Sequence, residues 1–102
     1  MSAIELQSAG DFEWDAAKSE ARRVRRGFDF AYVLQSFADP ARVVTADDRW
    51  DNGEERYRLL GVIEGRVFCV AFTLRGETIR IISARKANRR EVIRYEDSPR
   101  QR

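Results

Sequence analysis

Residues 55–85 read ERYRLLGVIEGRVFCVAFTLRGETIRIISAR, and this stretch decides the fold. It contains three apolar-rich segments joined by two short turns that each contain a glycine, namely 55–64, 66–74 and 77–85. Segments rich in β-branched and aromatic residues that are separated by such turns are typical of antiparallel β-strands. The middle segment is apolar on both faces. We therefore expect a central strand that is covered on both sides, with Cys69 as a small core residue.

The two outer segments of this stretch carry arginines. Alternation along the third segment predicts Ile79, Ile81 and Ser83 on one face and Arg80, Ile82 and Ala84 on the other. Arg56 and Arg58 share a face of the first segment, which we expect to neighbour the strand of Arg80. Together with Arg75 they would widen a basic surface over the sheet. The alternative is that they pair with carboxylates on adjacent strands, such as Glu77.

The flanking sequence predicts the remaining elements. Apolar residues at helical spacing, N-cap residues and a following Gly or Pro predict helices at 16–26, 30–37 and 89–97. Short strands are expected at 11–14 and 42–46, with a polar loop at 47–54. The order is therefore β-α-α-β-β-β-β-α, an α+β domain in which helices pack on an antiparallel sheet. We expect one domain over 11–97, a frayed or disordered N-terminus over 1–10 and a basic tail over 98–102.

The composition excludes several kinds of chemistry. The chain has 102 residues, one cysteine and no histidine, so an internal disulfide is impossible. Without histidine, a Ser-His-Asp hydrolase, a histidine-based ribonuclease and a zinc site are not expected, and we predict neither a metal nor another cofactor. No apolar run approaches the roughly 18 residues of a membrane span, and residues 1–10 do not resemble a secretory signal. We therefore expect a cytoplasmic protein without a membrane partner.

Basic residues gather toward the C-terminal end of the chain. Of the 19 basic residues 17 are arginine, whose planar guanidinium fits phosphate oxygens. Four closely spaced cations lie where a predicted strand ends and the last predicted helix begins, namely Arg85, Lys86, Arg89 and Arg90. Because the start of a helix disfavours positive charge, this crowding predicts a phosphate site, with a solvated charged face as the alternative. A second cluster at 22–26 is interpreted as solvated helix surface, with contacts to a substrate backbone as the alternative.

Several stretches in order resemble the BrnT family of toxins. They are FEWD at 12–15 with Lys18, the Gly27 turn, FADP at 37–40, EERYRLLG at 54–61 and IRIISARKANRRE at 79–91. The last stretch is the most specific, and the resemblance runs from about Phe12 to Tyr95. It implies a RelE-like fold and a ribonuclease toxin of a type II toxin–antitoxin system. Family members commonly have Asn early in the first helix and Lys-His before the Gly turn, where this chain has Glu20-Ala21-Arg22 and Arg25-Arg26-Gly27.

The resemblance also implies a partner, and from the basic residues we form a hypothesis for the reaction. The partner would be a BrnA-like antitoxin that binds operator DNA through its own ribbon-helix-helix domain, so this chain would reach DNA only through it. In the reaction, the 2′-OH of RNA would attack the adjacent phosphate without a metal, and four cations would stabilise the growing charge, namely Arg80, Arg85, Lys86 and Arg90. Proton transfer would fall to Glu91, Tyr95 or solvent. Glu91 is alternatively a helix cap with Asn88, and Tyr95 is also a candidate for stacking on a base.

Two other functions compete with an active ribonuclease. The first is a catalytically impaired toxin homologue that acts as a binding partner or corepressor of a DNA-binding antitoxin, which the missing histidine motivates. The second is a general nucleic-acid-binding protein that binds duplex DNA by itself, with a steep dependence on salt. Expression without the antitoxin separates the first of these from the ribonuclease, because only an active toxin would arrest growth.

Overall fold

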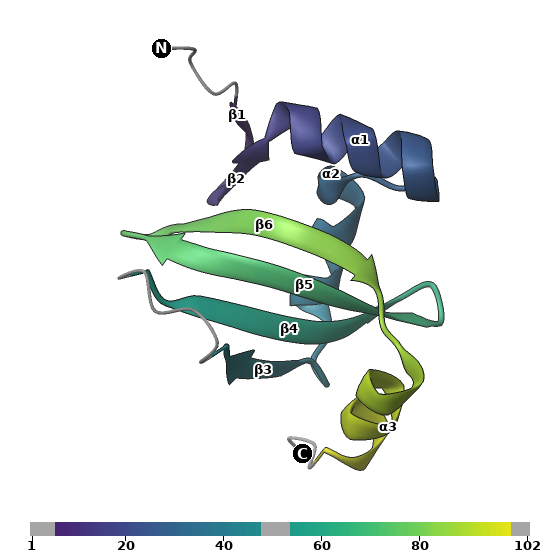
Figure 1. Ribbon diagram of the computed structural model, residues 1–102. Coiled ribbons are helices and arrows are strands. Elements are labelled where there is room, and N and C mark those ends of the chain that lie inside the picture. The colour runs from purple at the N-terminus through teal and green to yellow at the C-terminus, as the bar shows by residue number, and fades with distance from the viewer. Residues whose placement is uncertain (1–5, 48–53, 99–102) are drawn as a thin grey trace.

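The computed structural model describes residues 6–47 and 54–98, and Figure 1 shows how their helices and strands are arranged. Along the chain the elements are β1 (Leu6–Ala9), β2 (Phe12–Asp15), α1 (Ala16–Arg26), α2 (Phe30–Val33), the 3-10 helix η1 (Leu34–Ala38), β3 (Val43–Ala46), β4 (Arg56–Ile63), β5 (Arg66–Arg75), β6 (Thr78–Lys86) and α3 (Arg89–Asp97). The α+β class and the predicted order of elements from β2 onward are confirmed. Most of the predicted loop 47–54, all but residue 98 of the predicted tail and residues 1–5 lie outside the described residues.

The strands form one sheet in the order β1-β2-β6-β5-β4-β3. Neighbours are antiparallel except β2 and β6, which run parallel, so the sheet is mixed rather than purely antiparallel. Hairpin turns fix the direction of β5 against β4 and of β6 against β5, whereas no turn joins β2 to β6. The segment Leu6–Ala9, which the sequence placed in an irregular N-terminus, forms strand β1 against β2.

Two further expectations about the sheet are wrong. The strand of Arg56 and Arg58 does not neighbour that of Arg80, because β5 lies between β4 and β6, as consecutive hairpins require. The simple alternation along β6 also fails. Ala71 of β5 pairs with Ser83, whereas the next residue, Phe72, pairs with Ile81. Ile82 is therefore an extra residue in β6, and the register shifts there. This bulge brings Ala84 to the same core as Ile81.

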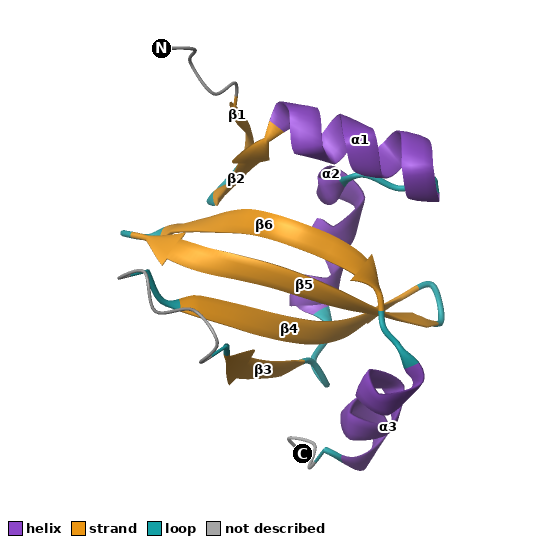
Figure 2. Ribbon diagram, in the orientation of Figure 1, coloured by secondary structure: helices purple, strands orange, loops and turns teal. Residues whose placement is uncertain are grey.

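The two faces of the sheet carry separate cores. Adjacent residues of β4 point to opposite faces, so Leu59 joins one core and Leu60 the other. The larger core packs against α2 and η1 through residues such as Phe30 and Val33. The smaller core lies under α3 and includes Cys69. Figure 2 shows α3 apart from α1 and α2, at the end of the sheet where β6 finishes. The predicted central strand, covered on both sides, is therefore confirmed as β5.

The predicted helix 30–37 is divided into α2 and η1. The Asp29 side chain caps α2 by accepting the N–H of Tyr32 at 2.9 Å. The chain then tightens into a 3-10 turn in which the Ser36 hydroxyl donates to the carbonyl of Val33 at 2.7 Å. This turn places fully buried Ser36 directly on Gly61 of β4, where a side chain has no room. The tight turn and the glycine therefore depend on each other.

Gly61→Ala is expected to lower the free energy of unfolding by about 1–3 kcal/mol. A Cβ at this position would lie 2.5 Å from the carbonyl oxygen of Ser36 and 2.9 Å from its Cβ, so η1 must shift. Urea denaturation followed by circular dichroism measures the change. Val44→Ala, at an exposed valine of β3, serves as control and should change stability by at most about 0.5 kcal/mol. Equal stability of the two variants would contradict this packing.

Candidate functional site

Helix α1 lies along an edge of β6. In the described part of the chain, β2 pairs with β6 only as far as Trp14 and Ile81, so the second half of β6 has no strand neighbour on that side. α1 begins directly after β2, because the carboxylate of Asp15 accepts the N–H groups of Ala17 at 2.9 Å and Lys18 at 3.1 Å. The helix therefore occupies the place beside β6 that β2 leaves open.

A hollow of about 240 Å³ separates α1 from this edge of β6. It is lined by Lys18, Ala21, Arg22, Arg25, Phe30, Ile82 and Ser83. α1 is held in place by the hydroxyl of buried Ser19, which accepts the N–H of Phe30 at 3.0 Å. The basic side chains of α1 therefore line the edge of the sheet, rather than only facing solvent as the sequence suggested.

The last turn of α1 and the end of β6 enclose a second hollow, which we call the cationic pocket. It has a volume of about 390 Å³ and is lined by Arg25, Arg26, Phe28, Arg85 and Lys86. Gly27 ends α1 with a φ of 85°, a conformation that favours glycine, and turns buried Phe28 into the core. The pocket thus joins two basic clusters that are far apart in the sequence. Sequence analysis singled out Arg85 and Lys86 but did not connect them with α1.

The cations of α1 crowd one another. The pKa of Arg22 is lowered, first by burial and then by the positive charges of Arg26 and Arg25. Within residues 6–47 and 54–98, no carboxylate forms an ion pair with any of four cations in these two hollows, namely Lys18, Arg22, Arg25 and Lys86. Uncompensated positive charge in a concave surface attracts anions, above all the phosphates of nucleic acid.

The carboxylate of Glu91 occupies the start of α3, where the sequence predicted a site for a phosphate. Arg85 donates from both terminal nitrogens to Glu91, at 2.7 and 2.9 Å. Glu91 also accepts the N–H of Asn88, and Asn88 accepts the N–H of Glu91, which completes a capping box. The Arg85 hydrogen bonds are the largest cause that lowers the pKa of Glu91 to about 2. Glu91 is therefore an ionised cap, as the alternative interpretation held, and is a poor proton acceptor.

Tyr95 is enclosed rather than presented to a substrate. It is buried in the smaller core, and its hydroxyl donates to Asp39 Oδ2 at 2.5 Å. The same carboxylate oxygen accepts the N–H of Val62 at 2.8 Å, so this contact fastens α3 to β4. The proposed roles of Tyr95 in stacking on a base or moving a proton do not fit this position.

Four arginines of the strands are each held by a carboxylate. Arg80 contacts Glu13 at 3.0 Å and Arg58 contacts Asp47 at 3.3 Å. Arg56 and Arg75 both contact Glu54, at 3.8 and 2.9 Å respectively. The alternative of pairing with carboxylates is therefore confirmed for Arg56, Arg58 and Arg75, although their partners are Glu54 and Asp47 rather than the expected Glu77. The pair of Arg80 with Glu13 was not expected from the sequence. None of the four lines the cationic pocket.

The other predicted residues occupy simpler positions. Arg89 and Arg90 are exposed in the first turn of α3 and remain accessible for contact with a nucleic-acid backbone. Cys69 is buried, and burial raises the pKa of its thiol to about 11, which confirms a core residue. No group of three carboxylate or thiol side chains that could hold a metal ion occurs among residues 6–47 and 54–98. No helix in the same residues is long and apolar enough to cross a membrane.

An α+β domain with a pocket lined by four cations, of which only Arg85 has a carboxylate partner in the described residues, fits a protein that acts on a nucleic acid. The model of one protein family, described as "Ribonuclease toxin, BrnT, of type II toxin-antitoxin system", matches residues 14–91. The match covers most of the chain, so the chain belongs to the BrnT family of ribonuclease toxins, and the resemblance seen in the sequence is confirmed. No curated protein matches the chain. Membership in a type II system implies a cognate antitoxin.

Glu91→Gln is expected to lower stability by about 1 kcal/mol near neutral pH, because a neutral amide pairs weakly with Arg85 but still accepts the N–H of Asn88. The pKa of Glu91 is lowered from 4.5 to about 2, so its contribution is complete above pH 4.5 and is lost as the pH falls toward 2. The difference in the free energy of unfolding between variant and wild type should therefore shrink as the pH falls from 4.5 to 3. Urea denaturation at a series of pH values measures it.

Glu96→Gln, at an exposed carboxylate of the same helix, is the control and should change the free energy of unfolding near neutral pH by at most about 0.5 kcal/mol. If the loss of stability in Glu91→Gln stayed constant down to pH 3, the ionised pair of Glu91 and Arg85 would be contradicted.

Proposed function

We propose that this toxin cleaves RNA by attack of a ribose 2′-OH on the adjacent phosphate, with that phosphate bound in the cationic pocket. The observation that carries the proposal is the convergence of Arg25, Arg26, Arg85 and Lys86 on one hollow. Membership in a family of ribonuclease toxins supports RNA as the substrate. The adjoining hollow between α1 and β6, with further cations, is suited to the neighbouring phosphates of the strand.

The pocket would act mainly through electrostatics. As the 2′-oxygen bonds to phosphorus and the bond to the 5′-oxygen breaks, negative charge grows on the phosphoryl oxygens. Guanidinium and ammonium groups placed around them stabilise this charge without moving. Because Glu91 is an ionised cap and Tyr95 is buried, we assign both proton transfers to solvent: water accepts the proton of the 2′-OH and donates a proton to the leaving 5′-oxygen. The products would be a 2′,3′-cyclic phosphate and a free 5′-OH.

The cations of α3 and of the strands have a lesser place in this proposal. Arg89 and Arg90 would contact the RNA backbone beyond the pocket. Arg80, Arg56, Arg58 and Arg75 are bound to carboxylates and would need to exchange partners before touching RNA. The pair between Arg75 and Glu54 is the most exposed of them, and because exposed ion pairs stabilise a protein by at most about 1 kcal/mol, Arg75 could exchange its partner for a phosphate most readily.

For the partner, we propose a BrnA-like antitoxin with a ribbon-helix-helix domain. Its own domain would bind operator DNA, and this chain would reach DNA only through it. An antitoxin that covers the cationic pocket with acidic side chains would block RNA and neutralise the same charges. Toxin, antitoxin and RNA would meet in the cytoplasm.

Lys86→Gln and Arg25→Gln are each expected to slow RNA cleavage roughly 10- to 100-fold, because each removes one charge from the bound phosphate. Neither side chain has a carboxylate partner in the described residues, so both variants should fold. Cleavage of a single-stranded RNA by purified toxin, freed of antitoxin, measures the rates. Arg94→Gln, at an exposed arginine of α3 outside the pocket, is the matched control and should cleave at the wild-type rate. Wild-type rates for both pocket variants would contradict the proposal.

A corepressor without catalysis is the second candidate function. Three observations favour it. Arg85 and Arg80 are already bound to carboxylates, Tyr95 is buried, and the chain has no histidine. Expression of the toxin without its antitoxin distinguishes the two functions. Growth arrest that Lys86→Gln relieves supports the ribonuclease. Harmless accumulation of folded wild-type protein supports the corepressor.

A further inference from the structure

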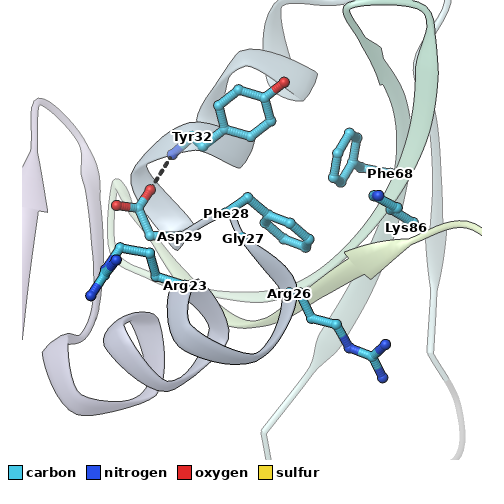
Figure 3. Close-up of a pocket in the computed structure, with 8 residues that line it drawn as sticks. All are labelled: Arg23, Arg26, Gly27, Phe28, Asp29, Tyr32, Phe68 and Lys86. Carbon is cyan, nitrogen blue, oxygen red and sulfur yellow. Dashed lines mark hydrogen bonds between the residues drawn. The ribbon is translucent and has the colours of Figure 1, made fainter.

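A third hollow adjoins the cationic pocket and differs from it in having an aromatic floor. We call it the aromatic pocket. It has a volume of about 480 Å³ and is lined by Arg23, Arg26, Gly27, Phe28, Asp29, Tyr32, Phe68 and Lys86. Figure 3 shows the rings of Phe28 and Phe68 and the ammonium group of Lys86 turned toward one space, with Arg23 and Arg26 on either side of the helix end.

The three rings form a fixed apolar surface. The ring centroids of Phe28 and Phe68 lie 5.1 Å apart, and those of Tyr32 and Phe68 lie 5.8 Å apart, both in edge-to-face arrangements. Phe28 and Phe68 are almost fully buried, whereas Tyr32 is half-buried. The hydroxyl of Tyr32 donates to Glu64 at the tip of the β4–β5 hairpin, which orients the ring. The floor therefore exists before any ligand arrives.

The charges around the rings favour an anionic ligand. Arg23 is paired with Glu20 on the same helix, at 2.5 Å. Arg26 and Lys86 have no ion pair with a carboxylate among residues 6–47 and 54–98. The one carboxylate of the lining, Asp29, is engaged as the cap of α2. Flat apolar rings beside uncompensated cations suit a flat ring that carries a phosphate, which is the chemistry of a nucleotide.

The two pockets also share residues. Arg26, Phe28 and Lys86 line both of them, so a group in one pocket lies next to a group in the other. A phosphate between Arg26 and Lys86 would direct its attached nucleoside onto the aromatic floor. Phe28 would contact both parts of the ligand.

We propose that the aromatic pocket receives one unstacked nucleobase of the RNA strand, next to the phosphate bound in the cationic pocket. The inference rests on the proposed function and adds a subsite that would select the nucleotide at the cleavage position. The strand would leave its stack at this place, because a base that lies against Tyr32, the most accessible of the three rings, cannot also stack on its neighbour in the RNA.

The test measures binding of short RNA oligonucleotides that cannot be cleaved. The probes are a 2′-O-methyl tetranucleotide and four copies of it, each of which lacks one base. Calorimetry with wild-type toxin should show that loss of one particular base weakens binding roughly tenfold, while loss of each other base has little effect. In Tyr32→Leu and Phe28→Leu this base-specific difference should shrink to less than about twofold. Tyr32→Phe, which keeps the ring, should retain the difference.

The outcomes separate this inference from the proposed function. The aromatic subsite would be overturned if the base-specific difference in affinity persisted in both leucine variants. It would also be overturned if removal of each of the four bases weakened binding equally. If Lys86→Gln still weakened every probe in that case, the phosphate site would stand. Failure of every probe to bind would overturn both. Unchanged RNA affinity of Tyr32→Leu with lost antitoxin binding would make the pocket a protein-docking site instead.

Discussion

The short pairing of β2 with β6 is the constraint on which the site depends. The two strands meet only as far as Trp14 and Ile81, and the bulge of β6 follows directly. A longer β2 would have covered this edge with another strand. Instead the chain turns into α1 after Asp15, and the helix runs beside β6 toward the start of α3. Every cation that α1 contributes to the hollows owes its position to this early turn.

The distribution of carboxylates decides which cations can act on an anion. Arg80, Arg58 and Arg85 each have a carboxylate within 3.3 Å, so they add little net charge to the surface around them. Arg25 and Lys86 have no such partner in the described part of the chain. Positive charge without a carboxylate partner therefore gathers where α1 ends and β6 finishes. Arg85, paired with Glu91 and yet about half exposed, links this place to the start of α3.

Sequence reasoning succeeded where local chemistry fixes structure. The Gly-containing turns predicted the hairpins β4–β5 and β5–β6, and Asn88 with Glu91 predicted the capping box of α3. It failed where position depends on distant contacts. Nothing local shows the bulge in β6 or the direction of β2 against it. The clusters at 22–26 and 85–86 are both visible in the sequence, but only the tertiary structure, which places the end of α1 beside the end of β6, brings them together. Tyr95 was misjudged because its partner, Asp39, is remote in the chain.

Solution NMR with ¹⁵N-labelled toxin and a 2′-O-methyl RNA oligonucleotide tests the central claim most directly. If a phosphate binds where α1 meets the end of β6, saturable changes in chemical shift should concentrate on the backbone amides of 25–28 and 85–87. Changes confined to the first turn of α3, or centred on the strand arginines Arg56 and Arg58, would contradict the account.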